Sequence, residues 1–146
     1  MGVPLYGVGC TGIPKKDNGL YQTSTAEPWA ASVPLSNGAG LCTDLTGNTP
    51  GCDPLLTPGA ATYSTLSNLR ANGYTSYFDS VSVAAWLYDP TTQTFWSYDD
   101  TLTASLKTVY VWTRVSGGLG GNFVWALKDD DANGSMVKTL AAGLGR

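Results

Sequence analysis

Hydrophobic and polar residues follow several distinct patterns along the 146-residue chain, and the first of these is a short apolar run. The run from Val3 to Gly9 ends in glycine-rich sequence and predicts one buried strand of the kind found in parallel sheets. Residues 11–57 are rich in Gly, Pro, Ser, Thr and Asn, and they are too many for an ordinary connection inside a compact domain. We therefore expect this stretch to belong to an insertion with short strands and turns of its own.

A helix is predicted in the middle of the chain, from Pro58 to about Ala71. Thr57 is a suitable N-cap, Pro58 is favoured at the first helical position, and Asn72-Gly73 is a typical stop. The apolar stripe of this helix would consist of Tyr63, Leu66 and Leu69.

A β-hairpin is predicted directly after this helix. Residues 77–88 and 94–98 are rich in aromatic and β-branched side chains, which favour strands. The polar residues 89–93 lie between them and predict an antiparallel hairpin with a longer turn. The alternation is imperfect over residues 81–86, so the register of the first strand stays open.

The last third of the chain begins with a second predicted helix. Asp99-Asp100-Thr101 provides a cap and an acidic first turn, and the helix would run to about Val115 before Gly117-Gly118 ends it. The expected apolar face of this helix consists of Leu102, Leu106, Val109 and Tyr110.

A strand and a final helix are predicted after it. Residues 119–126 are entered through glycines and then become apolar, as expected for a strand buried between helices. Residues 128–134 form a polar loop, and Ser135 is expected to cap a short helix. The apolar side chains of that helix would be Met136, Val137, Leu140 and Leu144. Helix, buried strand, loop and helix in this order form the repeating unit of a β/α barrel.

Composition narrows the class of protein. Hydrophobic residues make up 42% of the chain, which is enough for one core, and only 13% of residues are charged. Hydroxyl and amide groups must therefore build much of the surface, as in secreted and carbohydrate-handling proteins. The net charge of -3 and the scattered Lys and Arg residues argue against a nucleic-acid partner. No apolar run is long enough to span a membrane, and the chain begins directly on a strand, as expected of an internal fragment.

The three cysteines allow one disulfide. Cys42 and Cys52 bracket a turn-rich loop that could be closed by a disulfide, and two buried free thiols are the alternative. Cys10 is expected to be a small residue packed at a strand end, because the chain has no histidine that could activate it as a nucleophile. The same lack of histidine and the cysteine spacing predict no metal site, and no cofactor is expected.

Four segments, in this order and at this spacing, resemble the carboxy-terminal part of a family 18 glycoside hydrolase, a chitinase. The first is Pro4-Leu5-Tyr6-Gly7-Val8-Gly9-Cys10, which is similar to the family's Pro-x-Tyr-Gly-Arg-Gly-Trp strand. The others are Trp96-Ser97-Tyr98-Asp99-Asp100 with Ser105 and Lys107 in the next helix, Gly117-Gly118-Leu119-Gly120-Gly121-Asn122-Phe123-Val124-Trp125, and Asp130-Asp131-Ala132-Asn133-Gly134.

The resemblance implies an α+β fold class, as the terminal segment of a (β/α)8 TIM barrel that carries an inserted α+β module with antiparallel strands. Residues 1–10 would be a barrel strand, residues 11–98 the insertion module, and residues 99–146 the last barrel helix, strand and helix. The implied function is a part of a secreted, extracellular chitinase that hydrolyses β-1,4-linked N-acetylglucosamine polymers. The implied partners are chitin or chitooligosaccharides, and the remaining part of the barrel or a second copy of the chain, because two strands would leave open barrel edges.

The resemblance also implies substrate-binding residues. Trp125, at the end of its strand, would form an aromatic floor under the sugar, and a core tryptophan is the alternative. Tyr6 could reach the same sugar with its hydroxyl, and a role in packing is the alternative. Trp86 and Tyr98 are further candidates, and for Trp86 the core of the insertion or the wall of the cleft is the alternative. Capping explains Asp99-Asp100 best, whereas the cluster 129–131 could contact a sugar or a cation.

No catalytic residue is predicted. Family 18 places its acid at the end of an Asp-x-x-Asp-x-Asp-x-Glu strand, which is missing from this sequence, and the sole glutamate, Glu27, follows no such pattern. The chain alone is therefore predicted to be inactive. Val8, Cys10 and Ala126 depart from the family's Arg, Trp and Glu, which favours a non-catalytic, carbohydrate-binding chitinase-like protein as an alternative. A self-assembling structural extracellular protein is a second alternative, favoured by low charge and potential open edges.

Overall fold

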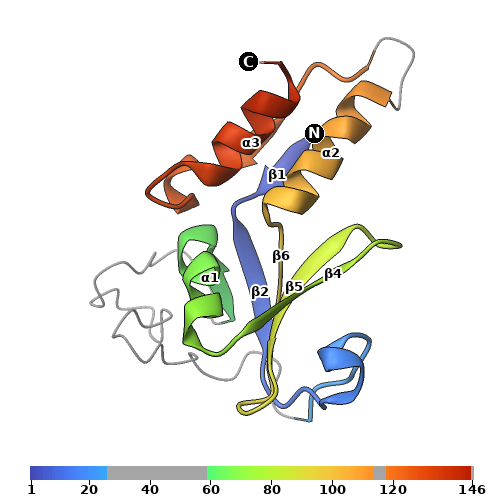
Figure 1. Cartoon of the computed structure of the whole chain (residues 1–146), viewed down its shortest axis with the longest axis vertical. Helices are drawn as coiled ribbons and strands as arrows, with labels where there is room; N and C mark the ends of the chain where they lie inside the picture. Colours follow the sequence, from blue (N-terminus) through green and yellow to red (C-terminus); the bar gives the residue numbers. More distant parts are fainter. Residues whose placement is uncertain (26–58, 114–117, 146) are drawn as a thin grey trace.

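The computed structural model describes residues 1–25, 59–113 and 118–145, and these residues form an α+β structure, as predicted. In Figure 1 an antiparallel sheet with one helix occupies one end of the molecule, and two longer helices lie beside a short strand at the other. The elements are β1 (Gly2–Pro4), β2 (Tyr6–Cys10), η1 (Lys16–Gly19), β3 (Ala60–Thr62), α1 (Tyr63–Leu69), η2 (Arg70–Asn72), β4 (Thr75–Asp79), β5 (Ala84–Asp89), β6 (Thr94–Tyr98), α2 (Thr101–Thr113), β7 (Phe123–Trp125), η3 (Leu127–Asp129) and α3 (Ser135–Gly143).

The strands form two separate sheets. β1 and β7 make a parallel pair, and the other five strands make an antiparallel sheet in the order β3-β2-β6-β5-β4. The prediction of a single strand over residues 3–9 is therefore wrong, because the chain leaves the parallel pair after Pro4 and joins the antiparallel sheet at Tyr6. Leu5, fully buried at this junction, donates its N–H to the Trp125 carbonyl at 2.8 Å. A continuous apolar run does not reveal the break, since both sides of it are buried.

Helix α1 begins later than predicted. Residues 60–62 pair with β2 as strand β3, and Thr62 is the N-cap, its hydroxyl accepting a hydrogen bond from the Thr65 N–H at 3.2 Å. The predicted end is confirmed, because Gly73 follows the last turn at a φ of 93°, a conformation that favours glycine. The predicted stripe is also confirmed, since three of its side chains are buried: Tyr63, Leu66 and Leu69.

The predicted antiparallel hairpin is confirmed as β5 and β6, with Asp89 opposite Thr94 at its closed end. The Asp89 carboxylate accepts hydrogen bonds from the Thr91 N–H and the Thr92 hydroxyl, and these bonds hold the turn. The prediction of one strand over residues 77–88 is wrong, because a turn over residues 80–83 divides it into β4 and β5. This turn explains why polar and apolar residues alternate irregularly in this stretch.

Glycines in β2 allow the sheet to pack tightly. A Cβ atom added to Gly9 would lie 2.4 Å from the ring of Trp96, and one added to Gly7 would lie 2.6 Å from a methyl group of Leu66. Aromatic rings of β6 and the stripe of α1 therefore lie directly against the backbone of β2. The main core contains the following buried residues: Val3, Leu5, Ala61, Tyr63, Leu66, Leu69, Tyr74, Ala85, Leu87, Trp96, Tyr98, Ala104, Met136 and Leu140.

Helix α2 is confirmed as a helix, but its expected apolar face is not buried against the described core. Leu102, Leu106, Val109 and Tyr110 are all exposed, and Trp112 beside them is 60% exposed. The side chains that are buried instead are Thr103, Ala104, Thr108 and Val111. α2 packs on α3 through these mainly small side chains, with Gly143 of α3 directly against Thr108. Small residues permit close approach of two helices, so they are buried here in place of the larger apolar ones.

The buried strand predicted over residues 119–126 is also wrong in two respects. β7 spans three residues, and two of its side chains, Phe123 and Trp125, are exposed. α3 begins at Ser135 as expected, but aspartates of the preceding loop cap it in place of the Ser135 side chain. None of the described helices is long and apolar enough to cross a membrane.

Candidate functional site

The carboxyl end of the parallel pair β1–β7 carries Trp125 on one strand, and Tyr6 follows shortly after the end of the other strand. Pro4 and Trp125 are partners in the register, so both strands end at the same edge. Trp125 is 71% exposed there, and Tyr6, half-buried, follows Pro4 by two residues. Because the carboxyl ends of parallel strands carry the binding residues in many α/β proteins, this edge is the best candidate for a ligand site.

An open hollow adjoins this edge. Pro4 belongs to both, because it ends β1 opposite Trp125 and also lines the hollow, where Tyr6 is a further lining residue. The hollow lies among β2, the end of β6, the turn between β4 and β5, and the first turns of α2. Its lining residues are Pro4, Tyr6, Gly7, Val8, Ser82, Val83, Ala84, Ser97, Tyr98, Asp99 and Lys107. The lining thus combines aromatic rings, hydroxyl groups, one carboxylate and one ammonium group.

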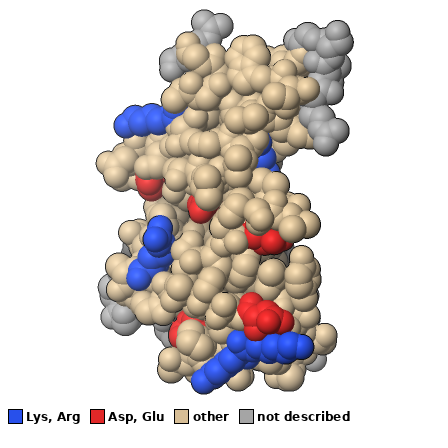
Figure 2. Space-filling view, turned by 45° about the vertical axis from the view of Figure 1, so that its right-hand side comes forward, with Lys and Arg blue, Asp and Glu red and all other residues tan. Residues whose placement is uncertain are grey.

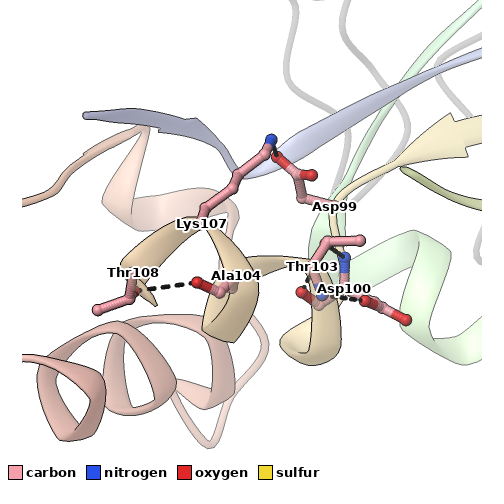
Figure 3. A network of polar contacts seen from close by, with 6 residues as sticks. All are labelled: Asp99, Asp100, Thr103, Ala104, Lys107 and Thr108. Atoms are coloured by element: carbon pink, nitrogen blue, oxygen red, sulfur yellow. Dashed lines mark hydrogen bonds and ion pairs between the residues drawn. The ribbon is translucent and has the colours of Figure 1, made fainter. Parts of the chain in front are cut away.

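An ion pair stands at the wall of the hollow. The Lys107 ammonium group reaches from α2 to the carboxylate of Asp99, which is 7% exposed (Figure 3). The next residue, Asp100, caps α2, because its carboxylate accepts from the Thr103 N–H at 2.8 Å while its own N–H donates to the Thr103 hydroxyl at 2.7 Å. Capping, as predicted, explains Asp100, and the ion pair explains Asp99.

Tyr98 lies at the border between the hollow and the core. It lines the hollow but is only 8% exposed, and its ring stacks on Tyr63 with 6.5 Å between ring centroids. Burial raises the pKa of the Tyr98 phenol, and a hydrogen bond with Ser76 lowers it in part. Tyr98 therefore contributes one surface to the hollow while most of its ring stabilises the core.

The structure does not bring Trp86 to the site. Its indole is 6% exposed, stacks between Tyr77 and Phe95, and donates its N–H to the Asn18 carbonyl at 3.0 Å. These contacts match the alternative interpretation, in which Trp86 belongs to the core of the insertion. Cys10 packs against the same cluster and is a free thiol, and burial raises its pKa.

The carboxylates of the aspartates that follow Trp125 accept hydrogen bonds from backbone N–H groups. Asp129 accepts from the Ala126 N–H at 3.3 Å, Asp130 accepts from the Met136 and Val137 N–H groups, and Asp131 accepts from the Ser135 N–H. Hydrogen bonds with Ser135, offset in part by burial, lower the pKa of Asp131. Among the described residues no group of three or more acidic, Cys or His side chains could hold a metal ion.

Sequence reasoning alone did not place Lys107, Ser82 and Val83 at the site. Lys107 entered only as part of a resembling segment, and the turn with Ser82 and Val83 was assigned to a strand. Their approach to Tyr6 depends on tertiary packing, for which the chain order carries no local pattern. Glu27, Cys42 and Cys52 lie outside the described residues, so the disulfide stays a prediction.

Charge is unevenly distributed over the surface. In the view of Figure 2, charged side chains lie mainly over the middle and lower parts of the molecule, and the upper part is largely uncharged. The two longer helices occupy this upper part (Figure 1), where the exposed side chains of α2 include Leu106 and Val109. The exposed surface of α2 in this region therefore carries several apolar side chains.

Comparison with known proteins gives consistent matches. Residues 1–130 match the family model described as Glycosyl hydrolases family 18. The chain is 31% identical to Chitinase A1 of Niallia circulans over 148 residues, which are 99% of this chain and 17% of that protein. Crystal structures of chitinase ChiW from Paenibacillus sp. and of a mutant GH18 chitinase from Cycas revoluta in complex with (GlcNAc)4 are similar in fold, with TM-scores of 0.71 and 0.67 at 23% and 22% identity. Each similarity covers 99% of this chain but only 10% and 33% of those chains.

Proposed function

The chain belongs to glycosyl hydrolase family 18, and from this membership we propose that it is the carboxy-terminal part of a chitinase or chitinase-like protein that acts on β-1,4-linked N-acetylglucosamine polymers. The chain spans about one sixth of the curated relative, 17% of its length, so the proposal gives it only one part of the function of the whole protein. That part is substrate positioning. The observation that carries it is the exposed Trp125 at the carboxyl end of β7, opposite Pro4, which lies two residues before Tyr6.

Trp125 has the chemistry that a sugar floor needs. An indole face offers a large apolar surface that can stack on the C–H face of a pyranose ring and exclude water from it. Tyr6 adds a phenolic hydroxyl at the same edge, which can donate or accept a hydrogen bond with a sugar hydroxyl or an acetamido group. A solved relative in fold is a complex with (GlcNAc)4, which supports a chitooligosaccharide as the ligand class.

The proposed division of the chain follows the two sheets. β1, α2, β7 and α3 would belong to a TIM barrel, and residues 11–98 to an inserted module. β2 pairs with β3 and β6 of the antiparallel sheet, so the first boundary is better drawn at Leu5 than at residue 10. An extracellular location is proposed with the chitinase function.

We propose that the remaining part of the protein supplies the catalytic acid and covers three surfaces of the chain, two of them apolar and one a strand edge. The first is the exposed face of α2, and the second is the edge of β7 that does not pair with β1. The third is a groove along β7 and α3, lined by Asn122, Phe123, Val124, Leu127, Val137, Leu140, Ala141 and Leu144. Unpaired strand edges and large apolar faces are costly in water, which supports a covering segment.

The experiment that tests the proposal is a titration of the 146-residue chain with chitooligosaccharides. We expect quenching of tryptophan fluorescence that is lost in Trp125→Ala, and no release of reducing ends. Trp112→Ala is the matched control, because Trp112 is exposed on another surface and outside the hollow. Neither quenching nor product in the unmodified chain would refute substrate positioning by this chain.

A non-catalytic, sugar-binding protein is the second candidate. Val8 lines the hollow and is 38% exposed, so an apolar side chain stands where the family pattern has an arginine that could fix sugar hydroxyls. Sugar binding without turnover in the complete protein would favour this candidate. Concentration-dependent assembly without sugar binding would favour the structural alternative instead.

A further inference from the structure

Lys107 has the position and the free donors of a ligand-binding residue. Its ammonium group carries three N–H donors, and Asp99 is the acceptor found for it among the described residues. The side chain is 27% exposed and lines the same hollow as Tyr6 and Val8. Its remaining donors are therefore available to a ligand that enters this hollow.

Asp99 holds this ammonium group in place. The carboxylate is 7% exposed and stands at the end of β6, immediately before the cap of α2, so its position is set by two elements (Figure 3). A lysine fixed in this way loses less side-chain entropy when a ligand binds. The pairing also neutralises the charge, so the hollow suits an uncharged ligand rich in oxygen acceptors better than an anion.

We infer that Lys107 is a sugar-binding residue, which donates hydrogen bonds to hydroxyl or acetamido oxygens of an N-acetylglucosamine unit in the hollow whose lining includes Pro4, the register partner of Trp125. The inference rests on the proposed function, because the ligand class comes from it. It deepens that function by assigning the polar contacts to α2. Trp125 and Tyr6 would hold the sugar by stacking and by a phenol, and Lys107 would fix its orientation from α2.

Binding of the β-1,4-linked N-acetylglucosamine trimer to the 146-residue chain tests this assignment. We expect Lys107→Met to raise the Kd about tenfold and Lys107→Arg to leave it within about threefold, because arginine restores a cationic donor. Lys138→Met is the matched control, since it removes the same charge from an exposed position of α3. Urea unfolding of each variant separates lost binding from lost folding.

Two further measurements keep the test decisive. Val8→Arg in the Lys107→Met background should recover binding, because position 8 lines the same hollow and can return a cation to it. In the unmodified chain, the trimer should protect Lys107 from acetylation by acetic anhydride and leave Lys138 equally reactive. This measurement needs no variant to fold.

The outcomes distinguish the two proposals. Trimer binding that is unchanged in Lys107→Met, with no protection of Lys107, would overturn the inference. The ion pair would then have only a structural role, which is to connect the end of β6 to α2. The proposed function would stand in that case. Failure of the unmodified chain to bind the trimer would refute the proposed function, and the inference would fail with it.

Discussion

Asp130 connects the loop after Trp125 to the core of the molecule. Its carboxylate accepts hydrogen bonds from the Met136 N–H at 3.2 Å and from the Val137 N–H at 3.0 Å. These are first-turn donors of α3, which would otherwise have no partner in the helix. Because Met136 is fully buried, the bonds at Asp130 also fix the position of a core side chain.

Replacement of Asp130 should show this role. We expect Asp130→Ala to lower the free energy of unfolding by about 1 kcal/mol, the usual effect of losing a helix cap. Asp130→Asn is the matched variant and should retain much of the stability, since its amide oxygen can still accept. Urea unfolding followed by circular dichroism measures both. Equal stability of the alanine variant and the unmodified chain would contradict the proposed role.

At the residue scale, the sequence predicts a helix cap correctly where few side chains near the helix end can accept its N–H groups. Asp99-Asp100 was expected to cap α2, and Asp100 does so while the Asp99 carboxylate pairs with Lys107. Ser135 was expected to cap α3, but Asp130 and Asp131 take the helix donors. Several good caps stand within six residues there, and the loop conformation decides among them. The sequence alone does not contain that conformation.

At the scale of elements, close packing of β2 against β6 gives the sharpest prediction. We expect Gly9→Ala to destabilise the fold by about 1–3 kcal/mol, because its Cβ would lie 2.4 Å from the ring of Trp96 and force the ring to move. Gly120→Ala is the matched control, since no atom lies within 4 Å of the added Cβ and the change should be small. Thermal unfolding of both variants tests the difference, and equal melting temperatures would contradict it.

Helix α2 shows why element type is easier to predict than burial. A cap, apolar residues at helical spacing and terminating glycines predict a helix whatever surrounds it, and that prediction is confirmed. Which face is buried depends on the partner. Within the described part of the chain the partner is α3, whose Gly143 packs directly against the small side chain of Thr108. The larger apolar face of α2, which contains Leu106, is left exposed.

The exposed face of α2 should make the isolated chain self-associate. We expect Val109→Lys to weaken this association about tenfold, because the substitution places a charge among apolar side chains that would be buried in the contact. Val81→Lys is the matched control, because Val81 is 89% exposed in a turn on another surface. Sedimentation velocity over a range of concentrations measures the effect. A monodisperse monomer that unfolds cooperatively would count against both the association and the need for a covering partner.

At the scale of the whole molecule, two sheets of different kinds share one continuous core. Val3 of the parallel pair and Trp96 of the antiparallel sheet belong to the same buried cluster, together with Met136 of α3. The resemblance indicated both parts and their order along the chain. It did not indicate that the passage between them falls at Leu5, because the pairing partners of β1 and β2 are distant in sequence and only the folded chain selects them.

Buried tyrosines make the stability of this shared core depend on pH. Burial, followed by the charge of Asp131, raises the pKa of Tyr63 from 10.0 to about 12, and burial also raises the pKa of Tyr74, Tyr88 and Tyr98. Between pH 10 and 12 the folded state therefore keeps a proton on Tyr63 that the unfolded state loses. The free energy of unfolding should be insensitive to this group below pH 10 and should fall as the pH rises through that window.

Urea midpoints measured from pH 8 to 12 test this pH dependence. We expect them to decline above about pH 10, and the decline should be shallower in Tyr63→Phe, which has no phenol to ionise. Tyr21→Phe is the matched control, because Tyr21 is 82% exposed and its removal should leave the slope unchanged. The same decline in all three proteins would mean that Tyr63 is accessible to water in the folded chain. That result would also place the contact between α1 and the end of β6, where Tyr63 stacks on Tyr98, outside the stable core.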